Sequence, residues 1–199
     1  MLSRLLHPRW LKRRHLRQSL QKATHKKVII GAGKTRYPGW IATDKDILDV
    51  TIDKSWAKIS PPGAIDCLLA EHVWEHLADE DALRALQCAY RYLRKGGCLR
   101  IAVPDGNFPS SEYIERVRPG GKGPGADDHK RLYDFDSLSA LCKQAGFTVV
   151  LLEAWNNNGQ FIETAWNPDH GPIKRSRYND PRNEKEISYT SLLIDAVKP

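Results

Sequence analysis

Acid and base groups are concentrated in the segment Glu71-His72-Val-Trp-Glu75-His76. In the spacing His-x-x-Glu-His, two histidines on one helix face can hold zinc beside a glutamate base. This segment directly follows an apolar run at 64–70, where a parallel sheet places a loop and the start of a helix. We therefore predict no metal here. Two interpretations stay open. Either Glu75 and His76 fix the loop by local hydrogen bonds, or Glu71, His72 and His76 line a pocket for a substrate that carries a hydroxyl group. In such a pocket, a histidine can remove a hydroxyl proton.

A short glycine loop, Gly31-Ala-Gly33, follows the apolar run at 27–30. Glycines there let the backbone approach a ligand closely, with free N–H groups facing it. A phosphate-binding P-loop needs a glycine at position 28, and a dinucleotide fingerprint needs one at position 36; neither is present. What remains is a glycine loop followed by Asp44 at the end of the next apolar run. An acid there can bind both hydroxyls of a ribose through its two oxygens.

Further candidate residues lie towards the C-terminus, after later strands. The predicted substrate-side residues are Asp105, Tyr113, His129, Tyr133, Arg175 and Arg177. The segment 119–125 is rich in glycine and proline, which predicts a loop. That loop is either a lid over the site or a surface connector. The arginines can bind a carboxylate or phosphate of an acceptor, or simply lie in solvent.

Apolar runs alternate along the chain with stretches of helical periodicity. The strands and helices that these patterns predict must position the candidate residues. We predict strands at 27–30, 40–43, 47–51, 64–70, 98–103, 147–153 and 188–197. Helices are predicted at 78–94, ended by Gly96-Gly97, and at 137–144. This alternation is typical of an α/β fold with a mostly parallel sheet, which binds ligands at the carboxyl ends of its strands.

Several motifs in this order resemble the short-form class I S-adenosylmethionine-dependent methyltransferases. They read VIIGAG at 28–33, PGWIATD at 38–44, AEHVWEHL at 70–77, LRKGGCLRIAVPD at 93–105 and DDHKRLY at 127–133. The closing YTSLLIDAVKP at 189–199 resembles the antiparallel last strand of that fold. The resemblance covers 27–199 and implies a Rossmann-like fold. Here the first crossover is shortened, since six residues separate Gly33 from Trp40.

The resemblance also implies S-adenosylmethionine as the cofactor. Gly31 and Gly33 would pass its methionine part, Asp44 would hold the ribose, and Asp49 would lie near the adenine. Glu71 and His72 would border the site.

The implied activity is methyl transfer to a small-molecule or glycan-like oxygen acceptor. Rate would come mainly from proximity and alignment. Two alternatives stay open: a non-catalytic binding or scaffold protein that keeps the fold, and an RNA-modifying methyltransferase.

The net charge of +7 comes from the N-terminus. Of the 31 lysines and arginines, nine lie in 1–27 with no acid, which leaves 22 against 24 acids in the rest of the chain. We therefore predict a basic helical arm at 1–26 and one domain at 27–199. The arm either docks on the domain or contacts anionic lipid or nucleic acid.

The four cysteines form no paired motif, and no run is long and apolar enough to span a membrane. The N-terminus lacks a secretory h-region, although an organelle transit peptide is an alternative. We expect a cytoplasmic protein, with peripheral membrane contact through the arm as an option.

Overall fold

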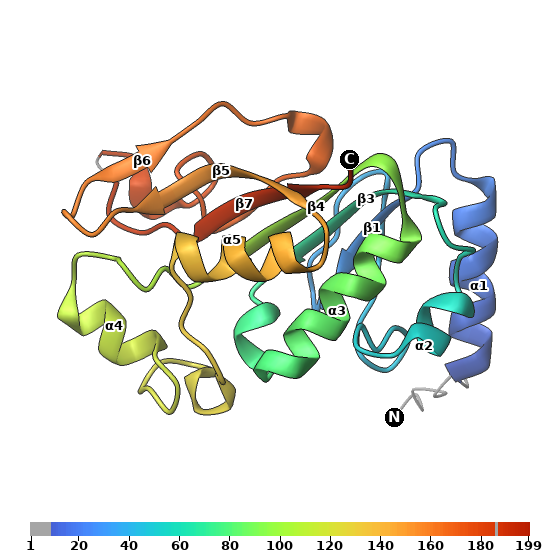
Figure 1. Ribbon diagram of the computed structural model, residues 1–199, viewed down its shortest axis with the longest axis horizontal. Coiled ribbons are helices and arrows are strands. Elements are labelled where there is room, and N and C mark those ends of the chain that lie inside the picture. The colour runs from blue at the N-terminus through green and yellow to red at the C-terminus, as the bar shows by residue number, and fades with distance from the viewer. Residues whose placement is uncertain (1–8, 186) are drawn as a thin grey trace, which may run out of the picture.

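One seven-stranded sheet forms the centre of the protein. The structure is a computed structural model that describes residues 9–185 and 187–199. The strand order is β2-β1-β3-β4-β7-β5-β6 (Figure 1). The strands are β1 (Lys27–Ile30), β2 (Trp40–Ala42), β3 (Ile65–Glu71), β4 (Leu93–Val103), β5 (Thr148–Trp155), β6 (Phe161–Glu163) and β7 (Leu192–Val197).

The strand directions confirm a mostly parallel, Rossmann-like α/β fold with an antiparallel last strand. β1 pairs in parallel with β2 and β3, and β3 pairs in parallel with β4. β7 lies between β4 and β5 and is antiparallel to both. The carboxyl ends of β1, β2, β3, β4 and β5 therefore meet at one edge of the sheet.

Three predicted elements differ in the structure. The strand predicted at 188–197 begins only at Leu192. The segment 47–51 is not a strand but a series of turns. Within it, the Asp49 carboxylate accepts the backbone N–H of Thr51 at 3.1 Å, a local bond that competes with strand pairing. The helix predicted at 78–94 ends at Tyr92, before the glycines. Leu93 already pairs with Ile65 of β3, so Gly96 and Gly97 lie inside β4.

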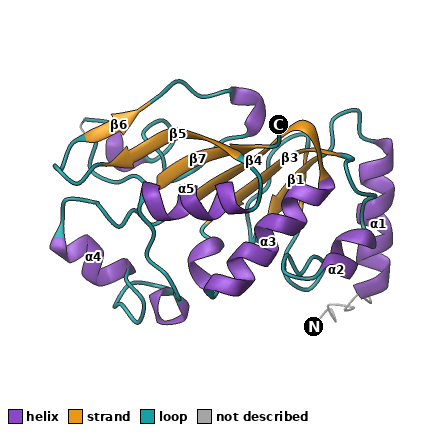
Figure 2. Ribbon diagram, viewed as in Figure 1, coloured by secondary structure: helices purple, strands orange, loops and turns teal. Residues whose placement is uncertain are grey.

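The helices are α1 (Arg9–Lys22), α2 (Asp53–Ala57), α3 (Asp79–Tyr92), α4 (Ser111–Val117) and α5 (Phe135–Gln144). Three acids at 79–81 in the first turn of α3 suit the positive end of its dipole. α5 begins with a capping box in which Asp134 accepts the N–H of Ser137 at 2.8 Å. α3 and α5 lie on the same face of the sheet (Figure 2).

The opposite face of the sheet is covered by irregular chain. Residues 31–39 make turns and no helix, so the first crossover is as short as the sequence predicts. A small core there contains Ile29, Leu69 and Leu193, and Ile173 packs on it from the segment between β6 and β7. Trp40 and Trp166 pack against this core from outside. The segment 164–176 thus replaces a helix as the cover of this face.

α1 docks on the domain. Leu16 and Leu20 are 6% and 2% exposed and belong to the main core. The Lys12 ammonium lies 2.9 Å from Asp46, and Arg13 Nε donates to the carbonyl of Ile47 at 2.9 Å. The rest of the predicted arm, residues 1–8, lies outside the described residues. Within the described part of the chain, no helix combines the length and apolarity needed to cross a membrane.

Candidate active site

The glycine loop is tied to the end of β2. Gly31 and Gly33 have φ of +60° and +50°, a backbone conformation that residues other than glycine rarely adopt. The Ala32 N–H donates to the carbonyl of Thr43 at 2.8 Å, and the Gly33 N–H donates to Asp44 Oδ1 at 3.0 Å. These contacts bring the loop and the acid together. Asp44 Oδ2 takes part in no hydrogen bond among the described residues.

A first cavity of about 260 Å³ lies at the ends of β1 and β3. Its lining includes Gly31, Ala32, Thr35, Glu71, His72 and Arg175. A Cβ on Gly31 would lie 2.6 Å from Val73 Cγ2, so only glycine fits at this wall. Of the predicted cofactor residues, Gly33, Asp44 and Asp49 are not part of this lining. The Asp49 N–H donates to Ser55 of α2, and its carboxylate accepts from Thr51 in the turn before that helix.

Glu71 holds a distant segment across this cavity. Its Oε2 accepts the backbone N–H of Lys174 at 3.2 Å, and its Oε1 accepts that of Arg175 at 3.0 Å. Lys174 Nζ donates to Thr35 Oγ1 at 3.2 Å. Both carboxylate oxygens are engaged, so Glu71 positions this segment at the cavity. Spacing along the chain shows nothing of this contact, since Lys174 lies 103 positions after Glu71.

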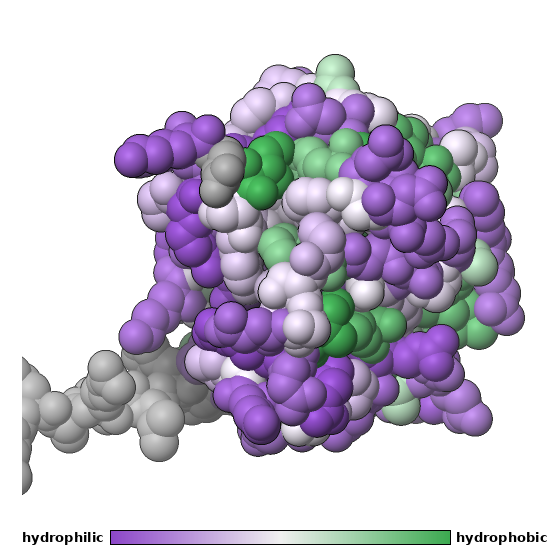
Figure 3. Space-filling model, turned by 90° about the vertical axis from the view of Figure 1, so that its left-hand side faces the viewer, coloured by the Kyte–Doolittle hydropathy of each residue, from purple (hydrophilic) through white to green (hydrophobic). Residues whose placement is uncertain are grey.

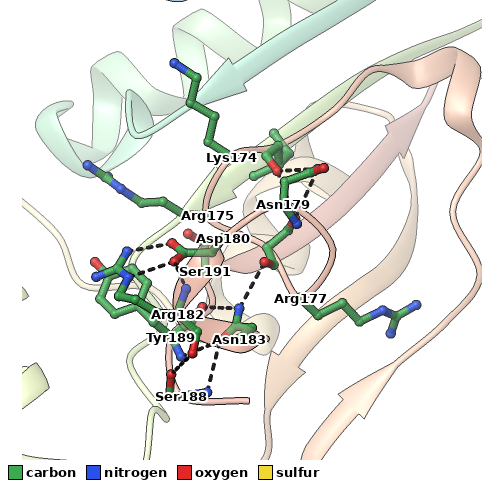
Figure 4. A network of polar contacts seen from close by, with 12 residues as sticks. Lys174, Arg175, Arg177, Asn179, Asp180, Arg182, Asn183, Ser188, Tyr189 and Ser191 are labelled. Atoms are coloured by element: carbon green, nitrogen blue, oxygen red, sulfur yellow. Dashed lines mark hydrogen bonds and ion pairs between the residues drawn. The ribbon is translucent and has the colours of Figure 1, made fainter. Parts of the chain in front are cut away.

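A polar network shapes that segment (Figure 4). Asn179 Nδ2 and Ser176 Oγ both donate to the carbonyl of Ile173 at 2.8 Å. Arg182 is bound to Asp180 through two side-chain hydrogen bonds of 2.8 and 2.6 Å. In Figure 4, Arg175 and Arg177 point to opposite sides of the segment. Arg175 lines the cavity, whereas Arg177 pairs with Glu153 and Glu163.

His72 stands at the end of β3 in a strained conformation. Its φ of +57° makes it the one non-glycine residue with positive φ in the described ranges. Its Nε2 lies 3.0 Å from Ser191 Oγ and its Nδ1 lies 2.8 Å from Glu75 Oε1. Strain of this kind persists where surrounding contacts hold it and is concentrated at functional sites.

A second cavity of about 320 Å³ adjoins the first, and His72 and Arg175 line both. Its remaining polar lining comes from Glu75, His76, Arg116, His129, Arg182 and Tyr189. The predicted residues His72, His76, His129 and Arg175 are thus brought together. Arg116, Tyr189 and Ser191 were not anticipated, because nothing in their local sequence distinguishes them. α4 and its loops lie at the end of the molecule seen in Figure 3, where the surface is mainly hydrophilic with small apolar patches.

Three predicted substrate-side residues lie in the packing around this site and do not line either cavity. Asp105 is fully buried and accepts the N–H groups of Trp155 and Asn107 at 2.7 and 2.9 Å. Burial raises the pKa of Asp105 to about 6. The hydroxyl of Tyr113 accepts the N–H of Asp105 at 3.2 Å, and Tyr133 is buried beside the Asp105 backbone. These groups hold the loop after β4 in place.

The sheet order, the glycine loop and its acid define the class I methyltransferase architecture. A family model described as a methyltransferase domain matches residues 23–152 of the chain. This match spans more than half of the chain, so the protein belongs to this methyltransferase family.

Solved methyltransferase structures share the fold over nearly the whole chain. An S-adenosylmethionine-dependent methyltransferase from Archaeoglobus fulgidus has a TM-score of 0.51 at 14% identity, covering 96% of this chain and 95% of that chain. A possible histamine N-methyltransferase from Thermotoga maritima has a TM-score of 0.53 at 18% identity, covering 96% and 93%. At such identities the likeness shows the fold alone. The comparison with curated proteins found no significant match.

S-adenosylmethionine is the cofactor of this methyltransferase family. The residues present fit it: Gly31 and Ala32 line the first cavity without a large side chain, and the carboxylate of Asp44 lies beside the loop, where it accepts the N–H of Gly33. Gly31 and Gly33, with Ala32 between them, would border its methionine part, and Asp44 would bind its ribose through the free Oδ2. When bound, the cofactor supplies an activated methyl group.

Proposed function

We propose that the protein methylates an oxygen atom of a small polar or glycan-like acceptor that binds in the second cavity. The observation that carries this proposal is the junction of the two cavities at His72 and Arg175. An acceptor in the second cavity would approach the cofactor in the first through this junction. Alignment at such a junction is the main source of rate in this kind of transfer.

His72 is the residue best placed to receive the proton of the acceptor hydroxyl. It lines both cavities, and its Nε2 now lies beside a hydroxyl oxygen, that of Ser191, at 3.0 Å. His76 and His129 line the second cavity only. Glu71 acts through the chain segment that it holds, and Arg175 offers a guanidinium to an anionic or hydroxyl group of the acceptor.

The test combines cofactor binding with transfer. Wild type and His72→Gln are titrated with S-adenosylhomocysteine by calorimetry, then incubated with methyl-labelled S-adenosylmethionine and a panel of saccharides, small hydroxyl compounds and RNA. We expect both proteins to bind the product, and only the wild type to label an oxygen of a small acceptor. Folding of both is checked by circular dichroism, and His25→Gln serves as the matched control, because this exposed histidine lines neither cavity.

Each other outcome has a defined meaning. Labelling of RNA, or of a nitrogen or carbon atom, overturns the acceptor class. Absence of product binding by folded wild type favours the alternative of a non-catalytic binding protein.

A further inference from the structure

We propose that Glu75, His76 and His129 form a binding site for a divalent transition-metal ion in the wall of the second cavity. One ligand atom from each of these side chains lies within 4.8 Å of the other two. Ligands of such an ion lie about 3 to 4 Å apart, because each is about 2.0–2.2 Å from the metal. A small inward movement of the side chains therefore completes the site. This differs from the helix-based zinc motif considered from the sequence, because the third ligand comes from a distant loop.

The burial of Glu75 is the first argument for an ion. The residue is 0% exposed. Its one close polar contact is His72 Nδ1, 2.8 Å from Oε1, and Oε2 has no hydrogen-bond partner among the described residues. A carboxylate taken out of water is costly unless it is paired or coordinates a metal. A cation between Glu75 and the two histidines supplies the missing partner.

The polar contacts of the two histidine rings are the second argument. His129 Nδ1 lies 2.7 Å from the carbonyl of Val117. A carbonyl only accepts, so His129 carries its proton on Nδ1 and leaves the lone pair of Nε2 for a metal. His76 Nδ1 lies 3.4 Å from Asp128 Oδ2 and makes no hydrogen bond among the described residues, so the second ring also has a nitrogen available to a metal. Metal-bound histidines are usually oriented by a carbonyl, as His129 is, or by a carboxylate.

The backbone holds the two parts of the site together. The carbonyl of Glu75 accepts the N–H of Lys130 at 2.7 Å and that of Arg131 at 3.2 Å. These bonds fix the loop that carries His129 against the short 3-10 helix Trp74–His76. The rings of His76 and His129 lie edge to face, 4.8 Å apart. The site is thus preformed rather than dependent on a rearrangement of the chain.

A second cluster of possible metal ligands among the described residues differs from the proposed site, because its carboxylate already has a cationic partner. Cys98, His170 and Asp195 are also close to one another. Both carboxylate oxygens of Asp195 are already bound by Arg100, at 2.7 and 2.8 Å, and His170 Nδ1 lies 2.8 Å from Oδ2. A buried guanidinium beside the carboxylate excludes a second cation. This cluster therefore serves as an internal control.

The ligand types select the metal. Two imidazoles and one carboxylate suit Zn²⁺, Mn²⁺, Fe²⁺ or Co²⁺ better than Mg²⁺ or Ca²⁺, which prefer oxygen ligands. Three protein ligands leave coordination positions open towards the cavity. An acceptor oxygen can occupy one of them, a role that rests on the proposed function, whereas metal binding itself does not.

The experiment measures metal binding without any acceptor. Chelator-treated full-length protein is titrated with ZnCl₂ and with MgCl₂ by calorimetry, and with CoCl₂ while its visible absorption is recorded. We expect one Zn²⁺ per chain, a cobalt absorption band, and much weaker Mg²⁺ binding. His76→Gln and His129→Gln should each weaken Zn²⁺ binding at least tenfold, while circular dichroism stays unchanged.

His170→Asn and His25→Asn are the matched controls, because they remove an imidazole from the second cluster and from the surface. Both should bind Zn²⁺ as the wild type does. The proposal is overturned if the wild type binds no Zn²⁺, or if His76→Gln and His129→Gln bind it like the controls. Failure to label any acceptor leaves these binding results unaffected, so the two proposals are tested separately.

Discussion

Arg100 of β4 and Asp195 of β7 form a buried, bidentate ion pair. The Arg100 Nε donates to Asp195 Oδ1 at 2.7 Å and its Nη2 donates to Oδ2 at 2.8 Å. The same guanidinium donates to the carbonyls of Asn167 and Gly171. Through these bonds Arg100 anchors the segment at 167–171 to the sheet. The same segment continues to Lys174 and Arg175 at the first cavity.

Asp195→Asn should destabilise the protein by about 3–5 kcal/mol, because it leaves the Arg100 charge buried without its partner. The measurement is urea unfolding followed by circular dichroism. Asp46→Asn is the control, since its pair with Lys12 is exposed and should contribute less than about 1 kcal/mol. Equal midpoints for the two variants would contradict this prediction.

Glu153 should make the protein less stable as the pH rises. Burial raises the pKa of this carboxyl to about 7, against the pull of Arg177. Because its folded pKa lies above its unfolded pKa, the stability that it contributes is full below about pH 4 and is lost as the pH rises through 7. Between pH 5 and 8, unfolding free energies of the wild type should fall by up to about 3 kcal/mol relative to Glu153→Gln.

Asp105 acts in the same direction, since burial raises its pKa to about 6. The decrease of the unfolding free energy with pH should therefore be smaller in Glu153→Gln but not abolished. A variant that follows the wild-type curve at every pH would show that Glu153 stays ionised in the folded protein.

Asp44→Ala should weaken S-adenosylhomocysteine binding by roughly 10- to 100-fold, since hydrogen bonds to a charged group are each worth about 1.5–3 kcal/mol. The measurement is calorimetric titration. Asp46→Ala removes a nearby acid that contacts α1 and should bind as the wild type does. If the two variants bind equally, Asp44 does not hold the ribose.

Gly31→Ala should lose cofactor binding and about 1–3 kcal/mol of stability. The new Cβ would lie 2.6 Å from Val73 Cγ2 on a backbone with φ of +60°. Gly39→Ala is the control, because its φ is +76° but nothing lies within 4 Å of the added Cβ. That variant should lose stability through its backbone and still bind S-adenosylhomocysteine.

Leu20→Ala should destabilise the whole domain by about 2–5 kcal/mol, because α1 inserts this buried side chain into the main core. Thermal and urea unfolding measure the effect, with exposed Arg14→Ala on the same helix as the control. If the arm is instead free of the domain in solution, both variants will unfold like the wild type.

Much of the fold follows from short-range patterns. The apolar runs that become β1, β3 and β4 are visible because buried parallel strands need continuous hydrophobic sequence. The one strand wrongly predicted, at 47–51, has the right apolar residues. It forms turns instead, because the Asp49 carboxylate binds the backbone N–H of Thr51. The glycine loop and Asp44 were found for the same local reason: the acid that accepts the N–H of Gly33 lies only eleven positions after it in the chain.

The sequence by itself thus determined the fold class, the family and the loop and acid of the predicted cofactor site, because these depend on residues near one another in the chain. The tertiary structure alone decided the rest of the site. It placed His129 beside Glu75, set Lys174 and Arg175 on Glu71, and turned Arg177 away from Arg175. These contacts join residues far apart in the sequence, and which of them meet depends on how the chain packs over the edge of the sheet.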